Sequence, residues 1–175
     1  MKRIIATVCA LILLLAGCGD AAKYKRGTLT DTGFESAFLG LAFTLPEGYE
    51  MASEEDMADF EEMMATASGG LPNVSVTVER LPHARLTVEQ YISSFKEQMA
   101  DSTFLSVSFV GEVEIVELAG QRWHKLSSVS TTYGMELFQD YLLRKVGDRI
   151  VSVVVTWSEG TADEMHELLE GFGPL

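Results

Sequence analysis

The sequence predicts a single α+β domain in which a twisted antiparallel sheet is covered by helices on both faces. Its second half contains four strand-like runs, separated by turns short enough for antiparallel hairpins, at about 105–118, 121–132, 135–146 and 149–157. Most residues from Ile150 to Trp157 are apolar on both alternating faces, and so are the pairs Leu137-Phe138 and Leu142-Leu143. Since a sheet with one face in water would alternate cleanly, the central strands should be covered on both sides.

Two further regions of the first half predict strands. Residues 28–45 are rich in Thr, Phe and Leu, with breaks near Gly33 and Ser36 that indicate a hairpin. Pro46-Glu47-Gly48 ends this region. Farther along, Asn73–Leu81 alternates three valines with polar neighbours, which is typical of a half-buried strand.

Three amphipathic helices are predicted, over about 54–67, 88–101 and 162–171. The first begins at Ser53 and Asp56, which resemble a capping box. Its apolar residues recur at helical spacing, at Met57, Phe60, Met63, Met64 and Ala67. Thr87 with Gln90 predicts the cap of the second helix, and Thr161 that of the third. The third helix should bury Met165, Leu168, Leu169 and Phe172.

The N-terminus ends a short apolar run with Leu15-Ala16-Gly17-Cys18, which is typical of a lipobox. Lys2 and Arg3 supply a positive start, and the apolar run of about a dozen residues is too short to span a bilayer, which takes roughly 20. Residues 1–17 are therefore predicted to be a lipoprotein signal peptide, with Cys18 as the lipidation site. An ordinary signal peptide with a coincidental cysteine is the alternative.

The predicted domains follow from this cleavage. Residues 1–17 form the signal peptide, 18–26 the lipidated N-terminus and polar tether, and 27–175 a single domain. Two or three acyl chains hold a protein on its membrane, whereas a single chain lets it dissociate. We expect a lipid-anchored protein on the outer face of the bacterial cell membrane or on a periplasm-facing membrane, with its partners near that membrane.

The mature chain is strongly acidic. Removal of residues 1–17 takes Lys2 and Arg3 away, so 11 basic side chains face 26 acidic ones and the formal charge falls from -13 to -15. Such a surface repels nucleic acid and anionic lipid headgroups, which argues against nucleic-acid partners and against membrane binding by a basic patch. Cys9 leaves with the signal and Cys18 is acylated, so no disulfide is expected.

Several segments together resemble small bacterial lipoproteins of the PsbP-like family. They are Gly40–Tyr49, the TVEQY sequence at 87–91, Leu118–Trp123 and Gln139–Ile150. The resemblance covers about 34–172, with Tyr49 where tryptophan is more usual. It implies an α/β/α sandwich, which the family shares with a Ran-binding nuclear-import protein, and a non-catalytic accessory or assembly role. Because the matching positions are turns and strand ends, the resemblance transfers fold more than activity.

The sequence contains no catalytic signature. The G-x-S-x-G, H-E-x-x-H, P-loop and G-x-G-x-x-G motifs are all absent, and the strand serines are expected on exposed or edge faces. His83, His124 and His166 fall in a loop, a strand and a helix without the spacing of metal ligands. We therefore predict a protein that is not an enzyme, with no catalytic residue, no cofactor and no metal site.

Three groups of side chains leave alternatives open. The first group is five methionines, namely Met51, Met57, Met63, Met64 and Met99. We predict that they pack in the core, and the alternatives are an adaptable partner surface or a copper(I) site. Solvated helix faces, rather than calcium ligands, are predicted for Glu54, Glu55, Asp56, Asp59, Glu61, Glu62, Asp163, Glu164, Glu167 and Glu170. The third group is the aromatic residues of the four-strand meander, namely Trp123, Tyr133, Tyr141 and Trp157. Their rings could fill the core of the sheet or line a cleft at its edge.

The leading functional hypothesis is a lipid-anchored, non-catalytic accessory domain that binds another envelope protein. It predicts a shallow apolar patch on the folded surface, bordered by the acidic helices. The alternative is a carrier or sensor of a small apolar ligand. That function needs an enclosed pocket of roughly 300 Å³ or more with few polar groups.

Overall fold

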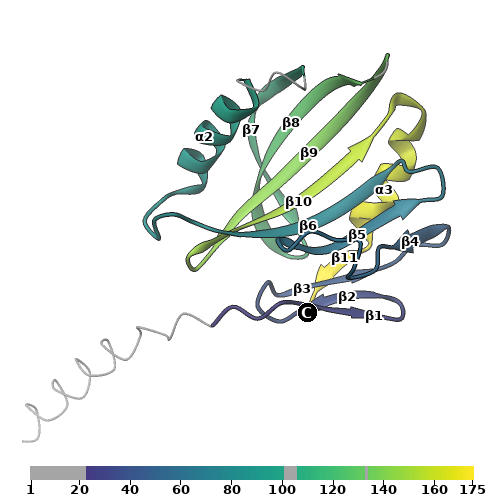
Figure 1. The fold of residues 1–175 in the computed structure, drawn as a ribbon, viewed down its shortest axis with the longest axis horizontal. Coiled ribbons are helices and arrows are strands. Elements are labelled where there is room, and N and C mark those ends of the chain that lie inside the picture. Colours follow the sequence, from purple (N-terminus) through teal and green to yellow (C-terminus); the bar gives the residue numbers. More distant parts are fainter. Residues whose placement is uncertain (1–22, 101–105, 133) are drawn as a thin grey trace, which may run out of the picture.

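Two antiparallel sheets and two helices make up the part of the chain that the computed structural model describes, residues 23–100, 106–132 and 134–175 (Figure 1). The lipobox with Cys18, and also Tyr133, lie outside these residues. The first strands are β1 (Thr28–Thr30), β2 (Gly33–Ser36), β3 (Leu41–Thr44), β4 (Tyr49–Met51), β5 (Glu61–Ala67) and β6 (Asn73–Arg80). They are followed by α2 (Val88–Ala100), β7 (Val107–Leu118), β8 (Gln121–Thr132), β9 (Met135–Val146), β10 (Arg149–Trp157), α3 (Ala162–Glu170) and β11 (Phe172–Pro174).

The larger sheet contains seven strands in the order β4-β5-β6-β10-β9-β8-β7, and the smaller contains four in the order β1-β2-β3-β11. Strands β7 to β10 follow one another as three hairpins, which confirms the predicted meander. The turn between β7 and β8 places Ala119 at φ 53° and Gly120 at φ 70°. A glycine at such a position carries no Cβ penalty, so it favours a tight turn between the two long strands.

The two faces of the larger sheet carry separate apolar clusters, as the two-faced apolar pattern predicts. On one face, Ile150 and Leu143 pack with α2 through Val88 and Ile92. On the other face lie α3 and the smaller sheet, packed on Val151, Val153 and Val155 of β10, with Met165, Leu168, Phe34, Leu41 and Phe43. The described fold is therefore mostly antiparallel sheet with two helices. One helix packs on each face, but the smaller sheet covers much of the α3 face as well. The predicted sandwich, in which helices alone cover both faces, is therefore not confirmed in that form.

The larger sheet has β7 at one edge and the short β4 at the other, and no described strand pairs with β7 beyond β8. Its ladder with β8 is interrupted between Val110 and Glu114, and Gly111 there has φ 71°. Glu112, Glu114 and Glu117 are exposed along this strand. A bulge and like charges are devices that make an edge unsuitable for pairing with another strand.

The helix predicted over about 54–67 is wrong, because this segment forms a loop followed by β5. The Ser53 hydroxyl donates to a carboxylate oxygen of Asp56 at 2.6 Å, and the Asp56 amide donates to the Ser53 carbonyl at 3.1 Å, so the cap-like pair makes a turn. A register shift lies between Glu61 and Met63, where β5 pairs with β6. This bulge breaks the two-residue alternation of a strand and leaves apolar spacings that also fit a helix.

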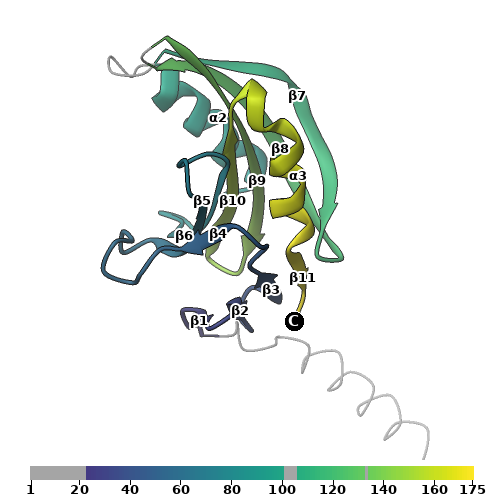
Figure 2. The same ribbon diagram turned by 90° about the vertical axis from the view of Figure 1, so that its right-hand side faces the viewer.

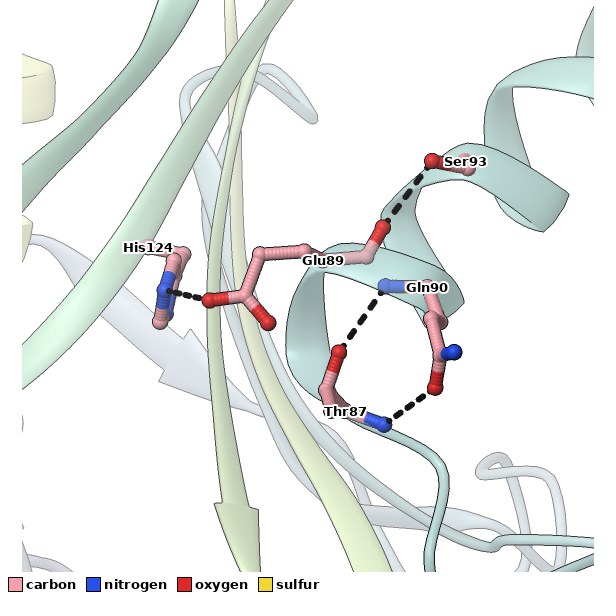
Figure 3. Close-up of polar contacts among 5 residues, drawn as sticks. All are labelled: Thr87, Glu89, Gln90, Ser93 and His124. Carbon is pink, nitrogen blue, oxygen red and sulfur yellow. Dashed lines mark hydrogen bonds and ion pairs between the residues drawn. The ribbon is translucent and has the colours of Figure 1, made fainter.

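The second and third predicted helices are confirmed, but the Thr161 side chain makes no capping hydrogen bond to α3 and instead bonds the backbone of Ser158. At the start of α2, the Thr87 hydroxyl accepts from the Gln90 amide at 3.3 Å, and the Gln90 side chain accepts from the Thr87 amide at 3.0 Å (Figure 3). This reciprocal pair is the capping box that the sequence predicts. Met165 and Leu168 of α3 are buried as predicted, whereas Phe172 is buried from β11 after the helix has ended.

Candidate functional site

A half-open cleft of about 480 Å³ lies between α3 and the strands β7, β8 and β9. Figure 2 shows the larger sheet curving around α3, with β7 beyond the helix. Apolar side chains form most of its walls, namely Val116, Leu118, Leu142, Met165 and Leu169. Charged and polar side chains complete it, namely Glu117, Lys125, Asp140, His166 and Glu170. We call this region the α3 cleft.

Strand register brings the polar groups of the cleft together. Ser127 of β8 lies opposite Asp140 of β9, and Lys125 lies opposite Leu142. Since residues two apart on a strand share a face, all four side chains belong to the face on which Leu142 packs in the α3-side cluster. The cleft floor is therefore set by the pairing of β8 with β9.

Asp140 is a buried carboxylate with two partners on β8. Its side chain is 8% exposed and lies 3.1 Å from the Lys125 ammonium, while the Ser127 hydroxyl donates to its other oxygen at 2.6 Å. A buried carboxylate without such partners would be costly to desolvate. Because the Ser127 hydroxyl donates to a carboxylate and not to an imidazole, the pair lacks the arrangement of an activated serine nucleophile.

The three histidines lie in separate places, as the sequence pattern predicts. His83 is in an exposed loop, and His166 is exposed on α3 beside the cleft. His124 contacts the carboxylate of Glu89 at 3.1 Å (Figure 3). The Thr87 hydroxyl, the Glu89 amide and His124 lower the pKa of Glu89. Within residues 23–100, 106–132 and 134–175, no three His, Cys, Asp or Glu side chains are placed to hold a metal ion.

The methionines that the sequence assigned to one helical stripe are separated, with Met57 in the loop before β5 and the other two on opposite faces of β5. Met63 is fully buried in the α3-side cluster, whereas its neighbour Met64 is half-buried and points to the opposite face. Met165 of α3, which was not in that group, lines the cleft. Core packing therefore accounts for Met63, and the predicted methionine stripe does not exist as one surface.

The acidic residues at 54–62 do not crowd a helix, which corrects the sequence-based expectation. Glu62 is 3% exposed and accepts from the Tyr24 hydroxyl and from the Gly27 amide, the latter at 2.7 Å. The bulge in β5 next to Glu62 marks where the strand alternation fails. This carboxylate fixes the start of the described chain to the domain.

Two of the aromatic residues singled out in the meander are core residues. Trp123 is completely buried and donates from its indole nitrogen to the Leu118 carbonyl at 3.1 Å. Tyr141 is 8% exposed and packs against Phe95 of α2, with ring centroids 5.1 Å apart. Trp157 is half-buried and stacks on Phe138 at 5.9 Å. None of the three lines the α3 cleft.

The polar floor of the cleft was not recognised from sequence. Lys125 and Asp140 are 15 positions apart, and only the β8–β9 register places them side by side. The available signal was an aspartate in the middle of a run expected to be a central strand. A buried charge at such a position requires a partner on a neighbouring strand.

None of the helices among the described residues is both long and apolar enough to cross a membrane.

Comparison with known proteins gives structural relatives only. No family model matches the sequence, and no curated protein matches it. The structure is similar to cyanobacterial PsbP (CyanoP) of Synechocystis sp. PCC 6803, with a TM-score of 0.56 and 11% identity over 87% of this chain and 99% of that one. It is also similar to LpqN of Mycobacterium tuberculosis, a protein involved in cell envelope biogenesis, with a TM-score of 0.53 and 8% identity over 76% of this chain and 82% of LpqN.

A third similar structure, from Bacteroides thetaiotaomicron, has a TM-score of 0.52 and 8% identity over 80% of this chain and 47% of that one. At such identities the likeness concerns the fold alone. The antiparallel seven-stranded sheet with its two helices has a PsbP-like fold.

Proposed function

We propose that this chain is a lipid-anchored, non-enzymatic accessory domain of the cell envelope that binds a segment of another envelope protein in the α3 cleft. The predicted lipobox supports the anchor, and the similarity to LpqN, a protein involved in cell envelope biogenesis, supports the setting. The single observation that carries the proposal is the cleft itself, with its apolar walls and its buried carboxylate.

The composition of the cleft indicates what it would bind. Its walls offer apolar contact through Leu118, Leu142 and Leu169, and its border carries Glu117 and Glu170. An apolar side chain flanked by basic residues would complement both features. Because the partner would have to reach a domain held near the membrane, a membrane-associated or envelope protein fits best.

Site-specific crosslinking in the native host tests this proposal. A photo-reactive amino acid at His166 or Glu170, both exposed at the cleft, should give one discrete adduct in intact cells. The same substitution at Glu97, exposed on α2, should give none. No adduct from either cleft position under several growth conditions, or the same adduct from Glu97, would contradict the proposal.

A matched pair of strand substitutions sharpens the test. Val116 lines the cleft, while Ile115 is 50% exposed and points to the opposite face of β7. Val116→Asp should abolish the adduct formed at His166, because it places a charge among the apolar walls, and Ile115→Asp should leave the adduct intact. Loss with both variants would indicate a general disturbance of β7 instead of a binding cleft.

A carrier or sensor of a small apolar ligand is the second candidate. The cleft volume of about 480 Å³ favours it, since ligand pockets begin at roughly 300 Å³. The half-open shape and the charged floor favour a protein segment instead. Native mass spectrometry of the protein purified from its host should show no co-purifying molecule, and a bound molecule lost in Val116→Asp would make the carrier the better proposal.

The anchor has its own test. Protein made in its own host should begin at Cys18, carry added acyl mass there and float with membranes, whereas Cys18→Ser should release it. Retention of residues 1–17 without acyl mass would contradict the anchor and the location together.

A further inference from the structure

The start of the described chain is fixed to the domain and does not form a free tether. The Tyr24 ring packs edge-on against Phe38, with centroids 5.3 Å apart, and the Arg149 guanidinium lies 3.8 Å from its centroid. The Tyr24 hydroxyl and the Gly27 amide both donate to Glu62, and Arg26 donates to the Glu61 carbonyl. From Tyr24 onward the chain therefore follows the surface of the domain.

This attachment limits how far the domain can stand from a lipid anchor. Six residues lead from Cys18 to Tyr24. Even fully extended, they span no more than about 20–22 Å, at roughly 3.3–3.6 Å per residue. If Cys18 is acylated, as the proposed function holds, the end of the molecule that carries Tyr24 faces the membrane.

Basic side chains gather at this same end. A cavity of about 530 Å³ is lined by Lys23, Arg80 and Arg149, and a smaller one of about 180 Å³ by Lys25 and Arg26. Phe38 lines both cavities, so the two cavities adjoin, and we call their five basic residues together the basic face. Figure 1 shows the start of the described chain and the β9–β10 turn at this lower end of the molecule.

The basic face differs from the rest of the chain. Five of the 11 basic residues that follow Cys18 lie in it, in a chain with 26 acidic residues. Three carboxylates adjoin it: Asp148 pairs with Arg80 at 3.0 Å, Glu35 lines the smaller cavity, and the buried Glu62 lies behind Tyr24. Four of its five basic side chains are exposed, namely Lys23, Lys25, Arg26 and Arg80. The face therefore has donors left for an external acceptor.

We infer that the basic face binds the phosphate groups of anionic phospholipids, so that the anchored domain rests on the bilayer in one orientation. The sequence-based expectation that an acidic chain avoids such headgroups rests on the net charge. Electrostatic interactions in salt reach only about 8–10 Å, so the charges nearest the bilayer dominate. The acidic remainder, repelled by the same surface, would strengthen the orientation by staying away from it.

Amine labelling of the intact acylated protein, reconstituted in vesicles, tests the inference. A membrane-impermeant amine reagent should label Lys23 and Lys25 several-fold more slowly in phosphatidylcholine vesicles containing one-third phosphatidylglycerol than in phosphatidylcholine alone. Lys96 on α2, distant from the basic face, serves as the internal control and should be labelled equally in both. The protection should disappear near 1 M salt, where the screening length falls to about 3 Å.

Variants and a soluble anion separate the alternatives. Lys25→Glu with Arg80→Glu should remove the protection of Lys23, whereas Arg85→Glu with Glu97→Lys, at exposed positions outside the face, should keep it. If inorganic phosphate protects Lys23 equally in phosphatidylcholine vesicles, the face is a site for soluble phosphate and the lipid assignment is overturned. Equal labelling in both vesicle types, with the protein still floating, overturns the inference while the anchor stands. Protein that neither floats nor carries acyl mass contradicts the proposed function instead.

Discussion

The α3 cleft and the basic face both contain an ion pair, and the two pairs differ in exposure. In the cleft, the side chains of Lys125 and Asp140 are 30% and 8% exposed. On the basic face, those of Arg80 and Asp148 are 75% and 44% exposed. A buried pair is committed to its own partners, whereas exposed charges remain available to another surface. The comparison suggests that the cleft is a preformed apolar site and that the basic face is an electrostatic one.

The largest effect is expected from breaking the buried pair. Asp140→Ala leaves Lys125 and Ser127 without their acceptor and should lower the free energy of unfolding by about 2–3 kcal/mol. This loss is smaller than the loss from breaking a fully buried pair, because the Lys125 side chain is 30% exposed. Urea unfolding measures the change. The double variant Lys125→Met with Asp140→Leu should regain most of the loss, since it removes both charges. A double variant as unstable as the single one would show that the charges are not the cause.

A smaller effect is expected from removing the buried acceptor behind the basic face. Glu62→Ala deprives the Tyr24 hydroxyl and the Gly27 amide of their partner and should cost about 1–3 kcal/mol. It should also free the chain around Lys25 for faster cleavage by trypsin. Glu50→Ala, at an exposed position on β4, is the control and should change neither property. Unchanged cleavage at Lys25 would mean that Glu62 does not hold the segment.

The attachment of Tyr24 should also depend on pH. Burial, with the hydrogen bond and charge of Glu62 adding to it, raises the pKa of Tyr24 from 10.0 to about 12. The folded protein binds the phenolic proton more tightly than the unfolded chain does. The stability that the protonated Tyr24 contributes to the fold is therefore fully present below about pH 10 and is lost as the pH rises to about 12. A difference titration of phenolate absorbance between the protein and Tyr24→Phe should place this group near pH 12. Ionisation near pH 10 would contradict the contact.

The smallest effect is expected from the exposed pair. Arg80→Ala should change the free energy of unfolding by less than about 1 kcal/mol, because both partners are well exposed. A double-mutant cycle with Asp148→Ala measures the coupling. A coupling as large as that between Lys125 and Asp140 would remove the distinction between the two regions.

Much of the fold could be predicted because its signals are local. The meander is marked by glycine turns between apolar runs, and the cap of α2 by Thr87 and Gln90. The prediction of a helix over 54–67 failed because a bulge at Glu62 interrupts the strand alternation. The hydrophobic periodicity of a sequence does not show where a strand carries one extra residue, because only the pairing of β5 with β6 reveals it.

The two candidate surfaces could not be predicted, because strand pairing and chain packing assemble them from distant residues. Arg80 and Arg149 meet as register partners of β6 and β10, and Tyr24 reaches Arg149 from the start of the described chain. Summing the charges over the whole chain hides this arrangement. The net value of -15 for the residues from Cys18 onward, derived from the 11 basic and 26 acidic side chains, averages a basic end with an acidic remainder.

The interrupted outer ladder of β7 has a consequence for crowding. Molecules confined to a membrane plane meet one another far more often than free ones. An open row of backbone amide and carbonyl groups would let neighbouring copies associate by intermolecular strand pairing. The distortion between Val110 and Glu114, together with the three glutamates, denies them a matching row. If the chain is lipid-anchored, as proposed, copies crowded in one bilayer would thus not associate through β7.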